Sequence, residues 1–244
     1  MGSAPPESLS LSSGEVHVWR ADLEQPVALQ EAFLGLLDQN ERARAGRFHF
    51  EKHRRRFVLG RGFLRVLLGR YLGLAPDQVR FVYGPYGKPA LADEHNTSRL
   101  CFNTSHSHEL AVYAFVQENE IGVDVEYIKT DFASEDIARH FFSADEVEAL
   151  MAIAEKERAA AFFRCWTRKE AYIKAIGSGL SHPLAEFDVS FAADEPAALL
   201  RDRRDTNATS RWSMFNLEFK GYAGALAVES INVDRVQIFD CPTQ

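Results

Sequence analysis

The chain has 244 residues, of which 46% are hydrophobic and 26% charged, and its formal net charge is −7. These proportions are ordinary for a globular protein and exclude a disordered chain, a coiled-coil rod and a collagen-like repeat. The apolar stretches are far shorter than the roughly 20 residues of a membrane span. The three cysteines are scattered and form no C-x-x-C pair, which argues against a zinc site and against a disulfide framework. We therefore expect a cytoplasmic protein.

The first half of the chain is predicted to contain both strands and helices. Residues 1–14 lack the basic and apolar regions of a signal peptide, so we expect a flexible tail there. Apolar residues at helical spacing predict a long helix over 52–72, which ends at Gly73. The other elements predicted in this half are a helix at 27–37 and strands at 15–19, 79–83, 100–103 and 110–116.

The second half shows a similar mixture. A long helix is predicted over 157–176, and Gly177 follows it as a C-cap. Helices and short, mostly antiparallel strands in both halves indicate the α+β class rather than a doubly wound parallel sheet. The other elements predicted in this half are helices at 134–142 and 144–153 and strands at 121–128, 187–191, 212–219 and 222–229.

Positive charge is concentrated in one segment of the chain. Residues 42–70 contain ten Lys or Arg and one acidic residue, a net charge of +9, so the rest of the chain sums to −16. Such a block is typical of a hydrated helix face or of a surface that binds a polyanion. Nucleic acid is disfavoured as that polyanion, because the protein is acidic overall and shows no nucleic-acid-binding motif. A phosphorylated small molecule and an acidic protein remain open.

Acidic side chains alternate along the strand predicted at 121–128. Asp124 and Glu126 lie two residues apart and therefore share a face, about 6.6 Å apart along the strand. Val123 and Val125 point to the opposite face. Two carboxylates at this separation can converge on one hard cation such as Mg²⁺. An ordinary amphipathic strand with a hydrated acidic face is the alternative.

Two further polar segments carry chemistry. On the second long helix, Glu170 and Lys174 lie one turn apart, as a surface ion pair does or as a carboxylate and a cation that face a phosphate. A polar turn is predicted to present Ser105 and His106 to a ligand. Zinc is disfavoured at this turn because no further ligands follow at zinc spacing. A Ser-His nucleophile is also open, but no G-x-S-x-G elbow supports it.

Taken in order, five segments of the chain resemble the 4'-phosphopantetheinyl transferases of the larger, surfactin-synthetase-activating type. Each segment is weak alone, but together they follow the family's order over about 95 residues. The segments are 86–89 (YGKP), 102–107 (FNTSHS), 122–126 (GVDVE), 139–143 (RHFFS) with Glu146, and 166–175 (WTRKEAYIKA) with 179–180 (GL).

The resemblance implies a fold and an activity. Family members look like two similar α+β halves in a pseudo-twofold arrangement, with short antiparallel sheets and the active site in the cleft between the halves. The halves here would be 15–118 and 119–244. The family's reaction transfers 4'-phosphopantetheine from coenzyme A to a serine of an apo acyl or peptidyl carrier protein and releases adenosine 3',5'-bisphosphate. We expect a monomer that uses Mg²⁺, or alternatively Mn²⁺, and that binds neither nucleic acid nor a membrane.

The resemblance also implies roles for single residues. Asp124, Glu126 and Glu170 are expected to hold the metal ion. Glu170, Lys174 and His106 are expected to act in the transfer, with Glu170 as the base for the carrier serine. The residues expected to bind coenzyme A are Arg44, Arg56, Lys88, Ser105, His106, Lys169 and Lys174.

The carrier protein is expected to dock on residues 130–150, which include Phe132, Phe141 and Phe142, although core packing is the preferred reading for Phe141. Glu41 stands where relatives often carry a second basic residue, so the contacts of the 3'-phosphate are left open. Two other functions also remain open. One is a Mg²⁺-dependent enzyme that acts on another phosphorylated substrate, and the other is a non-catalytic module that binds coenzyme A or a carrier protein.

Overall fold

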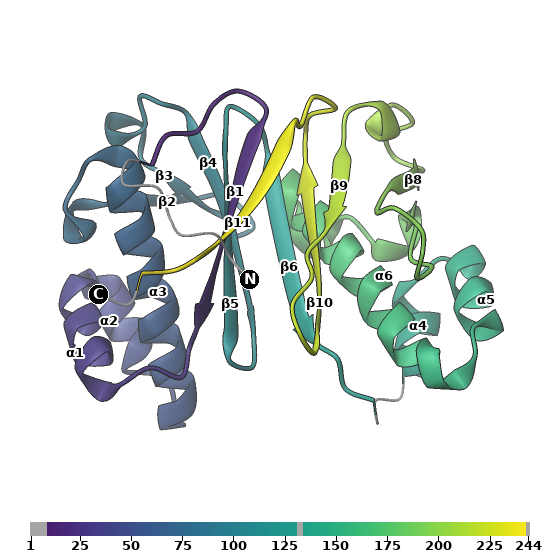
Figure 1. Ribbon diagram of the computed structural model, residues 1–244, viewed down its shortest axis with the longest axis horizontal. Coiled ribbons are helices and arrows are strands. Elements are labelled where there is room, and N and C mark those ends of the chain that lie inside the picture. Colours follow the sequence, from purple (N-terminus) through teal and green to yellow (C-terminus); the bar gives the residue numbers. More distant parts are fainter. Residues whose placement is uncertain (1–8, 131–133, 243–244) are drawn as a thin grey trace.

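The computed structural model describes residues 9–130 and 134–242, which form two halves side by side, each with a sheet and one 22-residue helix (Figure 1). This arrangement confirms the α+β class. The first half contains β1 (Glu15–Asp22), α1 (Val27–Leu36), α2 (Gln39–Ala45), α3 (Glu51–Leu72), β2 (Phe81–Tyr83), β3 (Pro89–Leu91), β4 (Leu100–Ser107) and β5 (Leu110–Gln117). The second contains β6 (Ile121–Tyr127), α4 (Ser134–Phe141), α5 (Ala144–Ala152), α6 (Glu155–Ile176), β7 (Phe187–Val189), β8 (Leu199–Asp202), β9 (Ser213–Asn216) and β10 (Tyr222–Val228). Strand β11 (Arg235–Asp240) comes last in the chain and joins the sheet of the first half. Short 3₁₀ helices lie at Pro76–Gln78, Asp93–His95, Gly179–Ser181, Leu184–Glu186 and Ala208–Ser210.

Two main sheets form the centre of the molecule. The first has the strand order β11-β1-β5-β4, and the second has the order β6-β10-β9. Neighbouring strands are antiparallel in both sheets except β1 and β11, which are parallel. The hairpins β2-β3 and β7-β8 form two small sheets of their own. Because Phe239 and Cys241 pack into the core of the first half, the expected division at residue 119 does not hold for β11.

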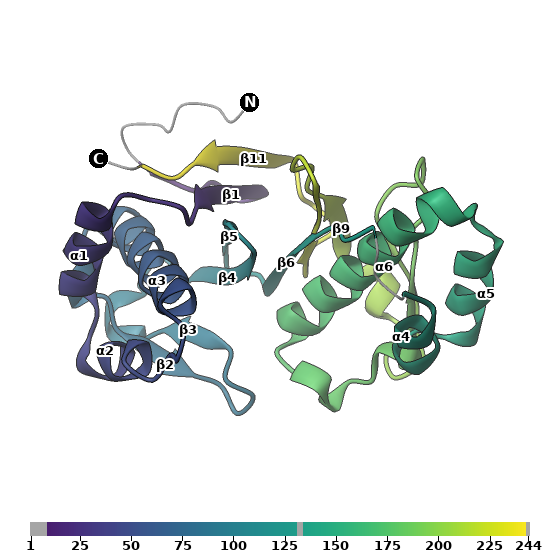
Figure 2. The ribbon, with the colours of Figure 1, turned by 90° about the horizontal axis from the view of Figure 1, so that it is seen from below.

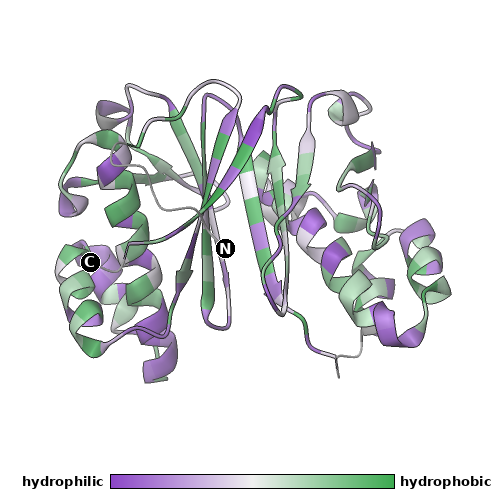
Figure 3. Cartoon of the chain, viewed as in Figure 1, coloured by the Kyte–Doolittle hydropathy of each residue, from purple (hydrophilic) through white to green (hydrophobic). Residues whose placement is uncertain are grey.

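Both sheets are buried on both faces, so the hydrophobic residues form three layers. Phe63 and Phe115 belong to the layer between the first sheet and α1 and α3. Val18 and Val123 belong to the layer between the two sheets. Phe162 belongs to the layer between the second sheet and α4 to α6. In Figure 3 the strands between the helical layers carry many of the hydrophobic residues.

The two long helices end where the sequence predicts. Gly73 and Gly177 follow α3 and α6 in the left-handed conformation, each with φ of 66°, which glycine adopts without strain. The helices are alike in length, in their ends and in their position against a sheet. A twofold rotation that relates the halves stays a prediction. No helix in the described ranges is both long and apolar enough to cross a membrane.

The two main sheets meet where β4 lies beside β6 (Figure 2). Side chains of β4 join these strands, because each of three β6 amides donates a hydrogen bond to one of them. We call this the β4–β6 seam. The bonds run from Val123 N to Asn103 Oδ1 (3.1 Å), from Val125 N to Ser105 Oγ (3.3 Å) and from Tyr127 N to Ser107 Oγ (3.1 Å).

Two local expectations are wrong. The segment after Asn103 is not a turn, because the β4 strand pairs with β5 as far as Ser107. Residues 9–14 are not a free tail, because Leu9 and Leu11 pack into the first-half core, while residues 1–8 lie outside the described range. The elements that the sequence did not predict are α2, β3, β8 and β11.

Candidate functional site

The acidic face of β6 lies against α6. Gly122 marks the crossing, because a Cβ there would lie 2.0 Å from Ala171 O and 2.4 Å from Ala175 N. Only glycine therefore lets the two backbones approach so closely. Asp124 and Glu126 share the Gly122 face of the strand, as predicted, and this approach places them near the side chains of α6.

Lys174 reaches from α6 to the β4–β6 seam. Its Nζ lies 2.6 Å from Asp124 Oδ1 and donates hydrogen bonds to Ser105 Oγ (3.1 Å) and Val123 O (3.3 Å). Asp124 is buried, so the lysine offsets a carboxylate charge that water does not reach. Glu170 lies one helical turn earlier. The predicted site residues that the structure brings together here are Asp124, Glu126, Glu170 and Lys174.

Burial and neighbouring charges raise the pKa values of Glu126 and Glu170. Burial raises the pKa of Glu170 to about 7, with the charges of Asp124 and Glu126 adding to the increase and Lys174 opposing it. Burial also raises the pKa of Glu126, although the hydrogen bond from Ser107 opposes this. A carboxylate with a pKa near 7 can take up and release a proton at neutral pH.

The chemistry of this cluster suits a hard divalent cation. Asp124 Oδ2 is buried and has no hydrogen-bond partner among the described residues, so it can serve a further cation. Carboxylate oxygens are preferred ligands of Mg²⁺. Within residues 9–130 and 134–242, however, no three His, Cys, Asp or Glu side chains are already arranged to hold a metal ion. The donors therefore fit in kind, and they would have to close around an ion.

A pocket of about 850 Å³ opens beside this cluster in the first half. We call it the cationic pocket. Its walls come from α2, α3, the β2–β3 hairpin and β4, and Ser105 and Ser107 of the seam are part of them. Several of its residues, including Arg61 and His53, were not predicted from the sequence. Their signal was present, because the contributions of α3 recur at the spacing of one helix face. The α3 residues that line the pocket are His53, Arg56, Phe57, Gly60, Arg61 and Leu64.

Arg56 is the most enclosed cation of the predicted pocket residues. Its side chain is only 11% exposed, and the carboxylate oxygens of Glu109 and Glu24 lie 3.6 and 3.9 Å from its Nη2. Its Nε and Nη2 are buried without a hydrogen-bond partner among the described residues. A buried guanidinium with unused N–H groups is suited to bind a phosphate.

His106 lies among cations in the same pocket. Burial lowers the pKa of its imidazole, and the charges of Lys174, Arg56 and Arg44 lower it further. Arg44 itself lies over the ring of Phe57, with its guanidinium carbon 5.1 Å from the ring centre. The pocket therefore concentrates positive charge around a neutral histidine, which favours an anionic ligand.

Lys88 joins the two halves at the other side of the site. Its Nζ donates hydrogen bonds to Ala175 O (2.7 Å) and to Glu120 Oε2 (2.6 Å). It therefore satisfies a carbonyl group in the last turn of α6, where a cation is favourable. Its neighbours Gly87 and Pro89 line the cationic pocket.

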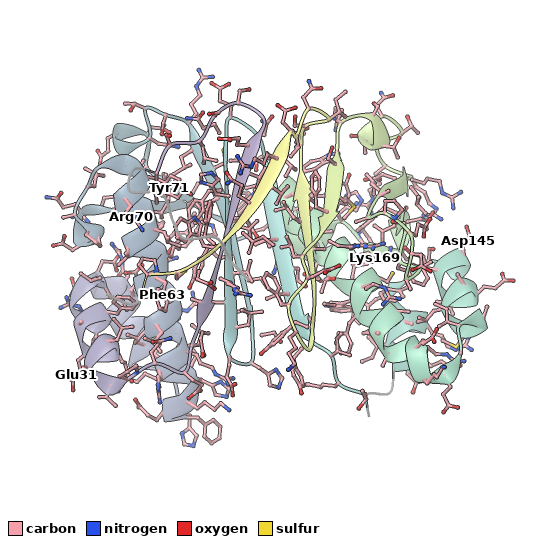
Figure 4. All side chains as sticks on the ribbon, viewed as in Figure 1. Glu31, Phe63, Arg70, Tyr71, Asp145 and Lys169 are labelled. Atoms are coloured by element: carbon pink, nitrogen blue, oxygen red, sulfur yellow. The ribbon has the colours of Figure 1, made fainter. Side chains whose placement is uncertain are left out.

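Lys169 does not lie at the site. Successive residues of a helix point about 100° apart, so Lys169 points away from β6 while Glu170 faces it. Its side chain is fully buried in the second half (Figure 4), where Nζ pairs with Glu146 Oε2 at 2.7 Å and donates to Leu184 O and Phe187 O. The expected contact between Lys169 and a phosphate is therefore wrong.

Ser105 is close to the pocket, but its hydroxyl is fully engaged. It donates to Asp124 Oδ1 (2.8 Å) and accepts from Val125 N and Lys174 Nζ. A serine hydroxyl has one proton and two lone pairs. No capacity is left for the expected phosphate contact unless one of these three bonds breaks.

Glu41 turns out to be an internal partner of arginines. It is 5% exposed, accepts hydrogen bonds from Arg61 and Arg65, and closes the capping box of α2. Of the aromatic residues expected at a docking surface, Phe142 is buried and Phe141 packs edge-on against Trp166. Phe132 lies outside the described residues.

Comparison with known proteins gives matches along most of the chain. The family described as the 4'-phosphopantetheinyl transferase superfamily matches residues 120–227, and the one described as 4'-phosphopantetheinyl transferase, N-terminal, matches residues 18–118. The 4'-phosphopantetheinyl transferase HetI of Nostoc sp. is 42% identical over 87% of this chain and 86% of its own length. The 4'-phosphopantetheinyl transferase Sfp of Bacillus subtilis is 33% identical over 70% of this chain and 75% of its own.

A solved structure shows a more distant likeness. The holo-[acyl-carrier-protein] synthase of Thermotoga maritima aligns with 46% of this chain and 62% of its own, at 20% identity and a TM-score of 0.36. That score is too low to establish a common fold, so the relationship rests on the sequence matches.

Proposed function

Since this chain belongs to the 4'-phosphopantetheinyl transferase superfamily, we propose that it moves 4'-phosphopantetheine from coenzyme A to a serine of an apo acyl or peptidyl carrier protein. The observation that supports this proposal most is the position of the cationic pocket directly beside a cluster of three carboxylates and a lysine. A polyanionic donor and a proton-accepting group are what such a transfer requires.

Coenzyme A carries a 3'-phosphate and a pyrophosphate, and the cationic pocket offers partners for both. Arg56 supplies buried N–H groups that have no hydrogen-bond partner among the described residues. We assign the nucleotide part to Arg44, Arg56 and His106, with Lys88 beside the adenine nucleotide. Negative charge next to His106 favours its protonated form, so binding of the ligand raises the pKa of this imidazole.

Asp124, Glu126 and Glu170 would hold Mg²⁺, or Mn²⁺ with the same donors. When bound, the ion would neutralise the pyrophosphate and the charge that develops during the transfer. The unpartnered Asp124 Oδ2 and the raised pKa values of Glu126 and Glu170 support this assignment. Lys174, which now neutralises Asp124, would then be available to the phosphate that is attacked.

Glu170 takes the proton in the proposed reaction. The serine oxygen of the carrier forms a bond to the β-phosphorus of coenzyme A, while the serine proton passes to the Glu170 carboxylate, directly or through a water. The bond from that phosphorus to the bridging oxygen breaks, and its electron pair leaves with adenosine 3',5'-bisphosphate. Without a bound cation the pKa of Glu170 is about 7. A cation held by the same carboxylate would lower this pKa and keep Glu170 ionised, as a proton acceptor must be.

We further propose a monomer that works in the cytoplasm. Both parts of the site come from one chain, and the cysteines Cys101, Cys165 and Cys241 are free, as is usual in a reducing compartment. The carrier would dock beside α4 and α5. Size-exclusion chromatography tests the monomer, and crosslinking to a carrier tests the docking surface.

Intact-protein mass spectrometry tests the function. Wild-type protein, coenzyme A and MgCl₂ are mixed with a panel of apo carriers, and EDTA serves as the metal control. A phosphopantetheine-sized mass gain that EDTA abolishes supports the proposal. No gain on any carrier, with coenzyme A still bound in calorimetry, favours a binding module. No gain and no binding contradicts the proposal.

Glu170→Gln tests the proposed base. We expect the transfer rate to fall by roughly 10²-fold or more, because the amide accepts no proton, while the Kd for coenzyme A stays within about threefold. Glu155→Gln, on an exposed first-turn position of the same helix, is the matched control and should leave both unchanged. An equal loss of rate and of coenzyme A binding would contradict the role as a base.

A further inference from the structure

The β4–β6 seam contains the same arrangement twice. Ser105 Oγ donates to Asp124 Oδ1 at 2.8 Å and accepts from the next amide, Val125 N, at 3.3 Å. Two residues further along each strand, Ser107 Oγ donates to Glu126 Oε2 at 2.7 Å and accepts from the next amide at 3.1 Å. Each serine therefore holds a carboxylate and the backbone of the following residue with one hydroxyl.

The third hydrogen bond of the seam, which Asn103 accepts, has no carboxylate beside it. Asn103 Oδ1 accepts from Val123 N at 3.1 Å, but the residue before that amide is Gly122, which has no side chain. Asn103 thus joins the strands and does nothing for the acidic cluster. The seam therefore allows a comparison between Asn103, which only joins the strands, and Ser107, which joins the strands and also holds a carboxylate.

The hydrogen bond from Ser107 to Glu126 is shielded from water. Ser107 is 8% exposed, so water competes little for its hydroxyl. The hydroxyl has one proton, and that proton points to Glu126 because the Tyr127 amide supplies the other hydrogen bond. The direction of the Glu126 carboxylate is thereby tied to a strand of the other half.

We propose that Ser107 is a positioning residue that aims the Glu126 carboxylate at the divalent cation of the transfer reaction. This inference rests on the proposed function, in which Glu126 is a metal ligand. Groups that hydrogen-bond to a ligand carboxylate fix its direction, and losing one typically weakens metal binding by 10- to 100-fold. Ser107 acts through Glu126 and touches no reacting atom.

Mn²⁺ binding followed by electron paramagnetic resonance tests the proposal without turnover. Mn²⁺ is titrated into wild type, Ser107→Ala and Asn103→Ala, each saturated with coenzyme A and without a carrier, and coenzyme A alone is the blank. Both variants leave one β6 amide unpaired, so we expect a similar loss of a few degrees in Tm. We expect the Kd for Mn²⁺ to rise about tenfold or more in Ser107→Ala and to stay within about twofold in Asn103→Ala.

Two further variants separate positioning from general disruption. Ser107→Thr keeps the hydroxyl and should restore Mn²⁺ binding to within about threefold of wild type. In a Glu126→Gln background, Ser107→Ala should have no further effect on the Kd for Mn²⁺, because its partner is already altered. The control for overall integrity is the circular dichroism spectrum of Ser107→Ala, which should match that of wild type.

Several outcomes would overturn the inference. They are wild-type Mn²⁺ affinity in Ser107→Ala, an equal loss in Asn103→Ala, no rescue by Ser107→Thr, or a further loss in the Glu126→Gln background. Absence of Mn²⁺ binding by wild type would remove both the metal assignment and this inference. Failure of the proposed function is detected separately, as the lack of any mass gain on carrier proteins.

Discussion

Each of the two long helices α3 and α6 contains a completely buried cation whose partner comes from a short helix of the same half. Arg65 of α3 pairs with Glu41, and Lys169 of α6 pairs with Glu146. Both glutamates are the third residues of helices α2 and α5, where each also closes a capping box. Both cations also donate to backbone carbonyls. The same pair, a buried cation and a capping-box glutamate, therefore fixes a long helix in each half.

The two pairs differ in the group that donates a hydrogen bond to the second carboxylate oxygen of the glutamate. Glu41 Oε1 accepts from Arg61, which lines the cationic pocket and donates to Tyr83. Glu146 Oε1 accepts from the backbone amide of Val189. Glu41 of the first half thus contacts a residue of the cationic pocket, whereas Glu146 of the second half contacts the backbone of β7. Cations of equal charge therefore have different surroundings. Arg65 is linked to the cationic pocket through Glu41 and Arg61, whereas Lys169 is held by Glu146 and two backbone carbonyls.

The largest expected effect comes from breaking the buried pair of Lys169 and Glu146. Lys169→Met leaves Glu146 buried without its cation, so we expect the free energy of unfolding to fall by about 3–5 kcal/mol, measured by urea denaturation. Arg65→Met should cost less, because Glu41 keeps Arg61 as a partner.

Calorimetry with coenzyme A completes this test. Under conditions where Lys169→Met is folded, its Kd should equal that of wild type, because Lys169 does not face the pocket. A loss of coenzyme A affinity in proportion to the loss of stability would refute the interpretation that Lys169 acts in stability and not in binding.

An intermediate effect of the opposite kind is expected in the first half. Arg56→Ala removes a guanidinium that has buried, unused N–H groups, so coenzyme A should bind roughly 10- to 100-fold more weakly, as for hydrogen bonds to a charged group. The free energy of unfolding should change little. Arg54→Ala, a more exposed arginine on the same helix, is the matched control. Equal losses of affinity in both variants would indicate general attraction rather than a specific contact.

The smallest expected effect concerns pH and the core of the first half. Burial lowers the pKa of His17, with the charge of Glu15 opposing this, and its Nδ1 lies 2.7 Å from Tyr71 Oη. The unfolded chain therefore binds more protons than the folded one as the pH falls below about 6.5, so stability is full above that pH and declines below it. His17→Gln should reduce this slope in urea denaturation between pH 7.5 and 5. An unchanged slope would assign the acid sensitivity to other groups.

Sequence patterns predicted the parts of the fold that depend on local repetition. Helices α3 and α6 have many turns of regular spacing, so their starts were correct within two residues. Strand β11 was missed because its position depends on β1, which is far away in the sequence. Helix α2 was missed because it has only seven residues.

The candidate site was predictable to the extent that it depends on motifs. The motifs identified Asp124, Glu126, Glu170 and Lys174, which the structure places together. They did not reveal the direction of Lys169, because adjacency in a motif does not determine the helix face. They also assigned Ser105 to a ligand, because hydrogen bonds across the β4–β6 seam involve a second strand that a linear pattern does not show.

The parallel pairing of β1 with β11 has a consequence for the order of folding. Glu15 pairs with Arg235, so one neighbour of β1 is translated after the entire second half. During synthesis the second sheet can assemble from its own strands, whereas β1 has an open edge until residues 235–240 emerge. Open strand edges favour pairing with other chains. The half that is translated earlier is thus the half that completes its sheet last, and a nascent chain that stalls before β11 exposes an open edge of β1.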